Sequence, residues 1–391
     1  MTANAELSSP GPRPHQPTPA RASQMVQLIR DSWAAVEPQQ DDVARFFYGM
    51  LFSLAPGTRE LFAVNMEVQR SRLLRALVHV IQMIDRPDEL LPFLHQLGRD
   101  HRKFGVVSAH YEAVGTALLA AIKKHAGDAW TETVERAWAE AYTVMASAMI
   151  EASQSDEGPA WYEGEVVGHQ RLSWDLAVVQ VRTDHPVPYL PGQYVSVEIP
   201  QRPRLWRYLT PANAPADDGI LEFHVRSVDG GWVSRAVVGH AQLGDVWRIG
   251  SPMGQLHVDR EGGPDVLMIA GGTGLAPMRS IIEDLAQYGE NPGVRLFYGG
   301  RTRDDLYDLE NLQRVAMTNP WFSVTPVLEN DPTASGAEHG SLPEVVAAHG
   351  PWDEREVLVS GSPAMIRATV SKLLVAGTPM DRIHYDPFTL D

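Results

Sequence analysis

The feature that most constrains the fold is a glycine-rich turn at 270–280, with the sequence AGGTGLAPMRS. It follows an apolar run, DVLMIA, and opens a run with helical periodicity. Glycines at such a turn let backbone N–H groups approach a pyrophosphate at the positive end of the helix. The later strings VRLFYGG and EVLVSGS, the second followed by PAMIRATVSKLLVAG, continue the alternation of strand and helix. This pattern predicts a parallel sheet with crossover helices over 261–391, a nucleotide-binding α/β domain.

The residues before this region predict two further domains. Short β-rich strings such as DLAVVQVRT, GQYVSVEI and ILEFHVRSV are separated by Gly and Pro turns, which predicts an antiparallel β barrel over 161–260. Over 23–153 apolar residues recur every three or four positions, which predicts an all-α domain. The polar string SQSDEGPA at 153–160 is typical of a linker, and the Pro-rich segment 1–22 is typical of a flexible tail.

Composition narrows the possible partners and chemistry. Acidic residues outnumber basic ones by 49 to 33, and phosphate backbones and anionic lipids repel such a surplus, so we expect no nucleic acid partner. No stretch reaches the ~18 uninterrupted apolar residues of a membrane helix, and the N-terminal residues lack the apolar core of a signal peptide. We therefore expect a cytoplasmic protein without an integral membrane segment. Cysteine is absent, so any metal must be bound by His, Tyr, Met or carboxylate.

Three further strings accompany the glycine-rich turn. RYLT at 207–210 continues as PANAP, GGWVS spans 230–234, and SGSPAM spans 360–365. Together with GGTGLAPM these strings resemble the ferredoxin–NADP reductase superfamily, in which an R-x-Y-[ST] box and a G-G-x-x-S turn hold FAD and a C-G-P-x-x-M turn lies beside the nicotinamide. The resemblance implies FAD-binding roles for Arg207, Leu209, Thr210, Gly230, Gly231 and Ser234, and nucleotide-binding roles for Gly271, Gly272, Thr273, Gly274, Ser360, Gly361, Pro363 and Met365.

Some positions of this half depart from the family pattern or have two interpretations. Leu209 stands where the family has a tyrosine against the flavin, and Ser360 stands where it has cysteine. The terminal string IHYDPF resembles the family segment whose aromatic residue covers the flavin, which gives that role to Phe388, with plain C-terminal packing as the alternative. Arg301 and Arg303 are either contacts for the 2′-phosphate of NADP or solvated loop charges. We expect NADH rather than NADPH as the electron donor.

The helical domain carries a second resemblance, to the globin domain of flavohaemoglobins. Six residues stand in the order found there, namely Tyr48, Phe62, Gln69, Leu73, His101 and Tyr111. The resemblance implies haem b with His101 as the iron ligand, since a neutral imidazole binds iron and leaves the opposite face open for a gas. Phe62 then contacts the haem, Tyr48 and Gln69 are distal hydrogen-bond donors, and Leu73 restricts the pocket. The alternative for His101, Tyr48 and Leu73 is an ordinary place in a helix core.

One difference concerns the residues around the haem ligand. The family pairs a tyrosine, here Tyr111, with a glutamate late on the last helix, and together they polarise the proximal histidine. In this chain Ser153 stands at the glutamate position, and Glu151 lies two residues earlier and roughly 200° around the helix. We therefore expect a less basic His101 and a higher iron potential.

Taken together, the two resemblances cover nearly everything after residue 22 and identify the chain as a member of the flavohaemoglobin family. They imply an NAD(P)H-driven, FAD-relayed haem oxidoreductase, and specifically a nitric oxide dioxygenase that converts NO and O₂ to nitrate. Nicotinamide donates hydride and haem accepts single electrons, so the flavin converts one into the other. Two alternatives stay open: oxidation of a small organic donor with the same cofactors, and an oxygen- or redox-sensing globin. The expected partners are small molecules, and no obligate protein partner is evident.

Overall fold

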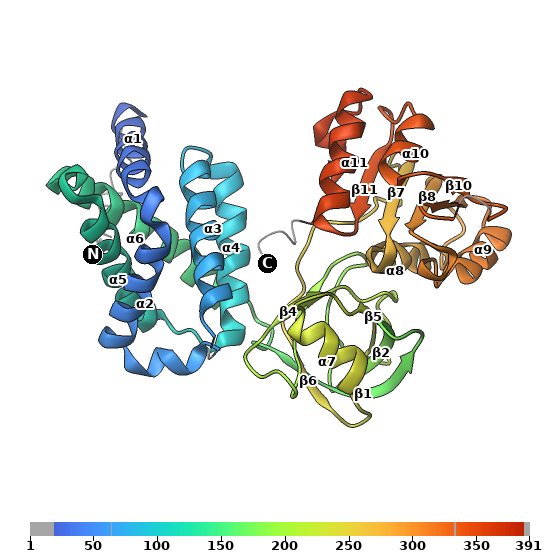
Figure 1. Cartoon of the computed structure of the whole chain (residues 1–391), viewed down its shortest axis with the longest axis horizontal. Helices are drawn as coiled ribbons and strands as arrows, with labels where there is room; N and C mark the ends of the chain where they lie inside the picture. The colour runs from blue at the N-terminus through green and yellow to red at the C-terminus, as the bar shows by residue number, and fades with distance from the viewer. Residues whose placement is uncertain (1–18, 64, 332–333, 387–391) are drawn as a thin grey trace, which may run out of the picture. The chain divides into compact units, whose positions relative to one another are not determined.

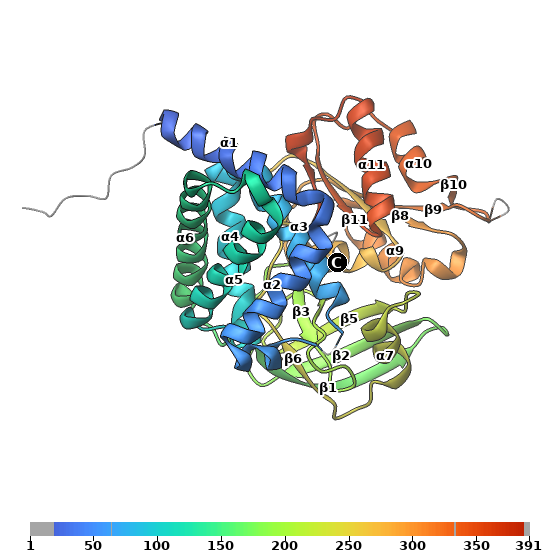
Figure 2. The same ribbon diagram turned by 60° about the vertical axis from the view of Figure 1, so that its left-hand side comes forward.

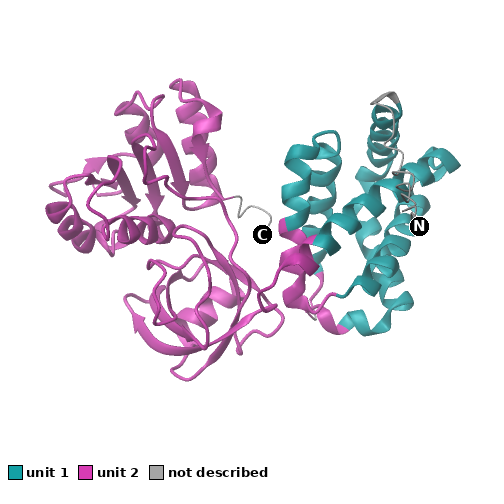
Figure 3. Ribbon diagram, turned by 180° about the vertical axis from the view of Figure 1, so that it is seen from behind, with its two compact units in different colours: residues 1–59, 67–95, 107–151 teal, residues 60–66, 96–106, 152–391 magenta. Residues whose placement is uncertain are grey.

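The computed structural model of the chain describes residues 19–63, 65–331 and 334–386. Contacts within the chain divide it into two compact units, which Figure 3 distinguishes by colour. Unit 2 contains the predicted barrel and α/β domain together with two short internal pieces of the predicted helical region, one of which includes His101. Unit 1 comprises Met1–Arg59, Glu67–His95 and Val107–Glu151, and unit 2 comprises Glu60–Met66, Gln96–Val106 and Ala152–Asp391.

The predicted all-α globin domain is confirmed, and Figures 1 and 2 show its helices. The first helix begins at Pro19, inside the segment that the sequence assigns to a tail, because Ala, Arg, Gln and Met favour helix and proline is tolerated in a first turn. The rest of that segment lies outside the described residues. The helices are α1 (Pro19–Val36), α2 (Gln40–Leu54), α3 (Glu67–Met83), α4 (Pro87–His101), α5 (Ser108–Ala126) and α6 (Glu132–Ser155), with 3₁₀ turns η1 (Glu37–Gln39), η2 (Pro56–Leu61), η3 (Arg102–Phe104) and η4 (Gly127–Ala129).

Apolar stripes of these helices form the core of unit 1. Trp138 of α6 is 1% exposed, and its indole N–H donates to the hydroxyl of Ser32 on α1 at 2.9 Å. Helices α5 and α6 approach closely at Gly115, where a Cβ atom would lie 2.5 Å from the ring of Tyr142. No single described helix is long and apolar enough to span a membrane, and one bent pair, Pro87–Phe104 with Ser108–Ala129, meets that criterion only when taken together.

The predicted antiparallel barrel is also confirmed. Its strands lie in the order β4-β3-β6-β1-β2-β5, and every neighbouring pair is antiparallel. An isolated bridge between Pro211 and Phe223 joins the segment after β4 to β5, so the sheet nearly closes on itself. The core is filled by fully buried side chains, among them Phe223 and Trp247. The elements are β1 (Tyr162–Arg171), β2 (Leu176–Thr183), β3 (Val195–Glu198), β4 (Arg207–Leu209), β5 (Ile220–Arg226), α7 (Trp232–His240) and β6 (Val246–Ile249).

The last part of the chain forms the predicted parallel sheet, with helices packed on both faces (Figure 1). Side chains of α8 and α9 fill the core on one face, and those of α10 and α11 fill the core on the other. The strand order is β10-β9-β8-β7-β11-β12. The strands are β7 (Val266–Gly271), β8 (Val294–Gly300), β9 (Phe322–Leu328), β10 (Glu338–His339), β11 (Glu356–Ser360) and β12 (Ile383–His384), and the helices are α8 (Leu275–Leu285), α9 (Leu309–Thr318), α10 (Leu342–Ala348) and α11 (Pro363–Val375).

This strand order determines where a ligand can bind. From β7 the chain adds β8, β9 and β10 on one side and then returns to add β11 and β12 on the other. The order therefore reverses between β7 and β11, and open α/β sheets bind ligands outside the carboxyl ends of the strands at such a point. The glycine-rich turn follows β7 and the SGSP string follows β11.

Candidate functional site

The two turns predicted to bind the nicotinamide nucleotide contact each other at this edge of the sheet. A Cβ atom on Gly274 would lie 2.5 Å from the carbonyl oxygen of Ser360 and 2.6 Å from the Cα atom of Gly361. Gly272 has a φ of +56°, in the left-handed region that favours glycine. Glycine is therefore required at Gly272 by backbone conformation and at Gly274 by close approach, as a cradle for a pyrophosphate at a helix start requires.

The start of α11 accounts for another departure from the family pattern. Ser362, which stands at the proline position of the C-G-P-x-x-M pattern, is the N-cap of the helix, and its hydroxyl accepts a hydrogen bond from the backbone N–H of Met365 at 3.3 Å. Pro363 occupies the first turn, where its missing N–H costs nothing. The methyl group of Met365 lies 3.2 Å from the position of a Cβ atom on Gly271, so this side chain packs against the glycine-rich turn.

The predicted flavin box lies on the short strand β4. Arg207 and Leu209 lie at its two ends, and Thr210 follows it directly. Leu209 is partly buried and packs against the barrel core. The strand was not predicted from the sequence, because three residues are too short a run to show an alternating pattern.

The predicted pyrophosphate turn, GGWVS, opens the helix α7. Gly230 has a φ of +76°, and Gly231 is the N-cap residue of α7. A Cβ atom on Gly231 would lie 2.4 Å from the hydroxyl of Ser234, which accepts a hydrogen bond from the backbone N–H of Val228 at 3.3 Å. Only a glycine fits between these groups, and the turn leads into a helix, which places its N–H groups at a helix start.

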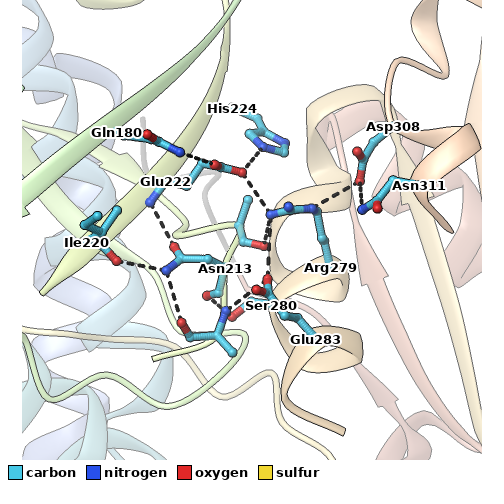
Figure 4. A network of polar contacts seen from close by, with 12 residues as sticks. Gln180, Asn213, Ile220, Glu222, His224, Arg279, Ser280, Glu283, Asp308 and Asn311 are labelled. Atoms are coloured by element: carbon cyan, nitrogen blue, oxygen red, sulfur yellow. Dashed lines mark hydrogen bonds and ion pairs between the residues drawn. The ribbon is translucent and has the colours of Figure 1, made fainter. Parts of the chain in front are cut away.

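A polar cluster, shown in Figure 4, joins the barrel to helix α8 inside unit 2. Arg279 donates to the carbonyl oxygen of Ala212 at 2.7 Å and forms ion pairs with Glu222 at 3.0 Å and Asp308 at 3.1 Å. The hydrogen bond from His224 is the largest influence that lowers the pKa of Glu222, to about 2, and burial opposes it. Glu222 is thus ionised at neutral pH and holds Arg279.

The same cluster fixes the PANAP continuation of the flavin box. The buried hydroxyl of Ser280 donates to the carbonyl oxygen of Asn213 at 2.7 Å. The side chain of Asn213 donates to the carbonyl oxygen of Ile220 at 2.8 Å and accepts from the backbone N–H of Glu222 at 2.8 Å. Arg279 and Ser280 therefore connect the helix after the glycine-rich turn to the segment after β4, and both connections lie within unit 2 (Figure 4).

His101, the predicted iron ligand, is the last residue of α4. Its Nδ1 atom lies 2.7 Å from the carbonyl oxygen of Leu97, and because a carbonyl only accepts, this contact places the ring proton on Nδ1. Burial lowers the pKa of the imidazole. The ring is therefore neutral with Nε2 as the unprotonated nitrogen, which is the form that a haem-iron ligand requires.

The predicted distal residues belong to unit 1. Tyr48 of α2 is 6% exposed, and burial is the largest influence that raises the pKa of its phenol, so it stays protonated. The hydroxyl donates to the backbone carbonyl of Gln69 on α3 at 3.4 Å, a long bond that involves the main chain of Gln69. Leu73 lies one helical turn after Gln69 and is partly buried. The structure thus brings Tyr48 and Gln69 together, with the phenol as a donor.

The remaining predicted haem-side residues fall in different parts of the structure. Phe62 is partly buried and belongs to unit 2, and Tyr111 of α5 belongs to unit 1. The carbonyl oxygen of Tyr111 accepts a hydrogen bond from Tyr142 at 2.5 Å, and burial raises the pKa of the Tyr111 phenol. Glu151 is exposed and Ser153 is partly buried, both in the last turns of α6. Phe388 lies outside the described residues.

The loop after β8 bears on the choice between NADH and NADPH. A carboxylate oxygen of Asp305 accepts hydrogen bonds from the backbone N–H groups of Arg301 at 3.0 Å and Thr302 at 3.2 Å. The other oxygen forms an ion pair with Arg226 at 3.0 Å. The donors at the start of this loop are thus already engaged by an anion of the chain itself. Arg301 and Arg303 are exposed.

Sequence reasoning missed Arg279 and Ser280 as positioning residues, although both belong to the string that carries the glycine-rich turn. The sequence did contain a signal, since these two polar residues directly follow the apolar helical start LAPM. In the structure Ser280 is fully buried. Buried polar side chains require partners, so a polar pair on an apolar helix face indicates a polar contact across an interface. The partners themselves come from distant parts of the chain and carry no local pattern.

Comparison with known proteins finds similarity to globin and oxidoreductase families in successive parts of the chain. Three families match: globin at residues 45–149, the oxidoreductase FAD-binding domain at 163–258 and the oxidoreductase NAD-binding domain at 268–371. The ferredoxin–NAD(P)⁺ reductase component of the naphthalene 1,2-dioxygenase system of Pseudomonas putida is 31% identical over 61% of this chain and 74% of its own length. A flavohemoprotein of Bordetella parapertussis is 28% identical over 75% of this chain and 78% of its own length.

A solved structure shows the same fold over almost the whole chain. The flavohemoglobin from Malassezia yamatoensis, determined with bound FAD and heme, aligns with a TM-score of 0.80. The alignment covers 93% of this chain and 98% of that protein at 17% sequence identity. The TM-score establishes a common fold.

Proposed function

Because this chain belongs to the flavohaemoglobin family, in which a globin domain precedes FAD- and NAD-binding oxidoreductase domains, we propose that it is a nitric oxide dioxygenase that uses NADH. It is an oxidoreductase with haem, FAD and a nicotinamide nucleotide as cofactors. When bound, these groups supply hydride transfer, its conversion to single electrons, and the binding of O₂. The residues of the chain hold these groups, orient them and supply protons and hydrogen bonds.

The residues present fit these cofactors. His101 offers a neutral imidazole whose Nδ1 proton is held by Leu97, so Nε2 is available to haem iron. The close approach at Gly274 and the left-handed backbone of Gly272 suit the pyrophosphate of a nicotinamide nucleotide. The helix start at Gly231 suits the pyrophosphate of FAD in the same way, and Arg207 and Thr210 are the proposed contacts for the rest of that cofactor.

The buried phenol of Tyr48 is the observation that supports the reaction with NO most directly. Burial keeps this hydroxyl protonated and therefore able to donate a hydrogen bond, as it does to the carbonyl oxygen of Gln69 at 3.4 Å. A preorganised donor in a water-poor site stabilises negative charge that develops on an oxygen ligand. Tyr48 is thus the proposed donor toward O₂ while NO reacts, and each NADH then yields two nitrate ions.

The loop after β8 supports NADH as the donor. A 2′-phosphate needs free N–H groups or arginine side chains near the end of the second strand of the nucleotide-binding unit. Here the carboxylate of Asp305 engages the backbone N–H groups of Arg301 and Thr302 and lies 3.7 Å from the Arg301 guanidinium. A second anion at this position would be repelled, whereas the uncharged ribose hydroxyl of NADH would not.

The experiment combines an electron-transfer assay with an NO assay. We expect NADH to reduce the haem without O₂, and aerobic protein with NADH to convert NO to nitrate. Tyr48→Phe should slow NO consumption roughly 10²-fold, which corresponds to a few kcal/mol of lost stabilisation. Reduction of ferricyanide by NADH should be unchanged in this variant, because that reaction requires only the reductase domains. Tyr142→Phe, which also removes a buried hydroxyl bonded to a main-chain carbonyl, is the matched control.

Oxidation of a small organic donor is the second candidate function. Leu209 and Ser360 favour it, since both alter positions that the family uses around the flavin and nicotinamide. Failure of NADH to reduce the haem anaerobically, or NO consumption no faster than by a simple oxygen-storage globin, would support this candidate. Small hydroxy acids and quinols would then be tested as flavin reductants.

A further inference from the structure

Lys103, two residues after the proposed iron ligand, is a buried cation. Its side chain is 3% exposed, and burying an ammonium group is costly unless the charge is compensated. The Nζ atom forms an ion pair with Asp100 at 2.5 Å. It also lies 5.0 Å from the ring centroid of Phe104 and 5.3 Å from those of Trp206 and Tyr208. One carboxylate and three aromatic faces therefore surround the charge.

This arrangement joins the helix end that carries His101 to the strand that carries the flavin box. Asp100 and Lys103 flank His101 in the chain, whereas Tyr208 is the middle residue of β4. Successive side chains of a strand point to opposite faces, so Tyr208 lies on the face opposite Leu209, which packs against the barrel core. The hydroxyl of Tyr208 donates to the second carboxylate oxygen of Asp100 at 3.5 Å.

Neighbouring contacts fix the same helix end to other parts of the reductase. The side-chain amide of Gln96, on α4, donates to the hydroxyl of Tyr194 at 3.2 Å, and the ring of Tyr194 makes an edge contact with Tyr208. Arg102 forms an ion pair with Asp156 in the linker at 2.5 Å. All of these residues belong to unit 2, and their contacts connect β4 to the residues on both sides of His101.

We propose that Asp100, Lys103 and Tyr208 form a coupling clamp, a set of positioning residues through which occupancy of the FAD site adjusts the orientation of His101 and the rate of electron delivery to haem. The proposal rests on the proposed function for His101 as the iron ligand and for Arg207 as a contact of FAD. Its physical basis is that cofactor contacts at Arg207 and the clamp contacts at Tyr208 come from the same three-residue strand. Coupling of this kind is reciprocal, so the haem site must influence the FAD site by the same factor.

The step that the clamp would affect is the transfer of electrons to haem, and NADH supplies all the electrons that this step requires. Each hydride carries two electrons, which reduce two equivalents of ferric haem to ferrous haem with release of one proton. Flavin reduction by NADH would precede this step and would depend on the turns at Gly274 and Ser360, which are not part of the clamp. The two steps can therefore be timed separately in one anaerobic stopped-flow experiment.

The test uses the complete, cofactor-loaded protein and a variant that removes both charges together, Asp100→Asn with Lys103→Met. This pair leaves no uncompensated buried charge, and the methionine suits an aromatic environment. Tyr208→Leu is the second variant, which removes the ring and hydroxyl on the strand side. Lys124→Met is the matched control, since Lys124 is an exposed lysine over the ring of Phe46 in unit 1.

The main readout is the iron–histidine stretching band of the ferrous protein, measured by resonance Raman spectroscopy with FAD bound and after FAD removal. We expect removal of FAD to shift the band in the unmodified protein and in Lys124→Met, and to leave it unshifted in both clamp variants. Haem reduction should slow by roughly fivefold or more in the clamp variants, a typical coupling factor, while flavin reduction stays unchanged. Three results would overturn the proposal. The band of the unmodified protein could stay in place when FAD is removed, the shift could persist in the double variant, or the rate of haem reduction could be the same in the clamp variants as in the unmodified protein.

The same measurements separate this proposal from the proposed function. Neither the band nor the reduction rates involve NO, so a protein that fails to consume NO still tests the clamp. If the unmodified protein lacks an iron–histidine band, or His101→Ala retains it, His101 is not the ligand and both ideas are refuted.

Discussion

Asp386 provides the sharpest test of the electrostatics of unit 2. The residue follows β12, is 4% exposed, and accepts a hydrogen bond from the backbone N–H of Gln255 at 3.1 Å. Its second carboxylate oxygen would lie 2.9 Å from a Cβ atom on Gly254, so the site is tightly enclosed. Burial raises the pKa of this carboxyl from 3.8 to about 6, and the hydrogen bond from Gln255 offsets only part of that rise. The folded protein therefore disfavours the charged form.

The size and sign of the effect follow from this shift. A pKa raised from 3.8 to about 6 corresponds to about 3 kcal/mol of unfavourable free energy for the ionised carboxyl. Below about pH 4 the group is neutral in both folded and unfolded chains, and the penalty is absent. Stability is then lost as the pH rises through about 6, above which the full penalty applies. Asp386→Asn keeps the shape and the acceptor oxygen without the charge, so it should stabilise unit 2 by up to about 3 kcal/mol at pH 7.5.

The assay is urea unfolding followed by tryptophan fluorescence, at a fixed excess of FAD and at several pH values between 4.5 and 8. We expect the gain in the free energy of unfolding to be largest at pH 7.5 and to shrink steadily below pH 6. Asp381→Asn, at an exposed position of the same chain segment, should show no such dependence. Two results would show that burial does not penalise this charge. The gain in the free energy of unfolding could be equal at every pH, or Asp386→Asn could be less stable than the unmodified protein at pH 7.5.

Three further predictions concern separate parts of the molecule. Gly274→Ala should slow flavin reduction by NADH about tenfold or more, because the new methyl group would collide with the carbonyl oxygen of Ser360. Haem binding should be unaffected, and unchanged stopped-flow kinetics of flavin reduction would contradict the prediction. Trp138→Phe should lower the free energy of unfolding of the globin domain by about 1–3 kcal/mol, because it removes the hydrogen bond to Ser32. Urea unfolding followed at the Soret band measures this change, and equal unfolding midpoints in the two proteins would argue against it. Asp305→Ala should raise kcat/KM for NADPH relative to NADH by about tenfold, and an unaltered ratio would remove this residue from nucleotide selection.

The architecture was predictable from the sequence because its signals are local. The alternation of an apolar run, a glycine-rich turn and a helical run specifies a strand followed by a helix wherever it occurs, as at Gly271 and Gly274. The contact between Gly274 and Ser360 was not predictable in this way, since it depends on β11 lying next to β7. That adjacency follows from the strand order of the whole sheet.

The features that escaped prediction depend on residues distant in the sequence. Lys103 lies in the string HRKF, which is typical of a solvated basic turn, whereas in the structure it is buried and lies over the rings of Trp206 and Tyr208, which are distant in the sequence. Arg279 likewise finds its partners on β5 and next to α9. Charged side chains carry no periodic signal that distinguishes a solvated position from a paired one, so such clusters require the fold to be known first.

The division of α4 between the two units has a consequence for the exchange of parts between proteins. The sequence places a boundary at the linker near 153, and a chimera built there would take the whole helical region from another globin. The segment Gln96–Val106, however, contacts the reductase as one of its own parts. A foreign globin joined at the linker would bring an unmatched helix end to the aromatic surface of Trp206 and Tyr208. Grafts that carry residues 96–106 along with the reductase would keep both the buried lysine and its aromatic surroundings intact.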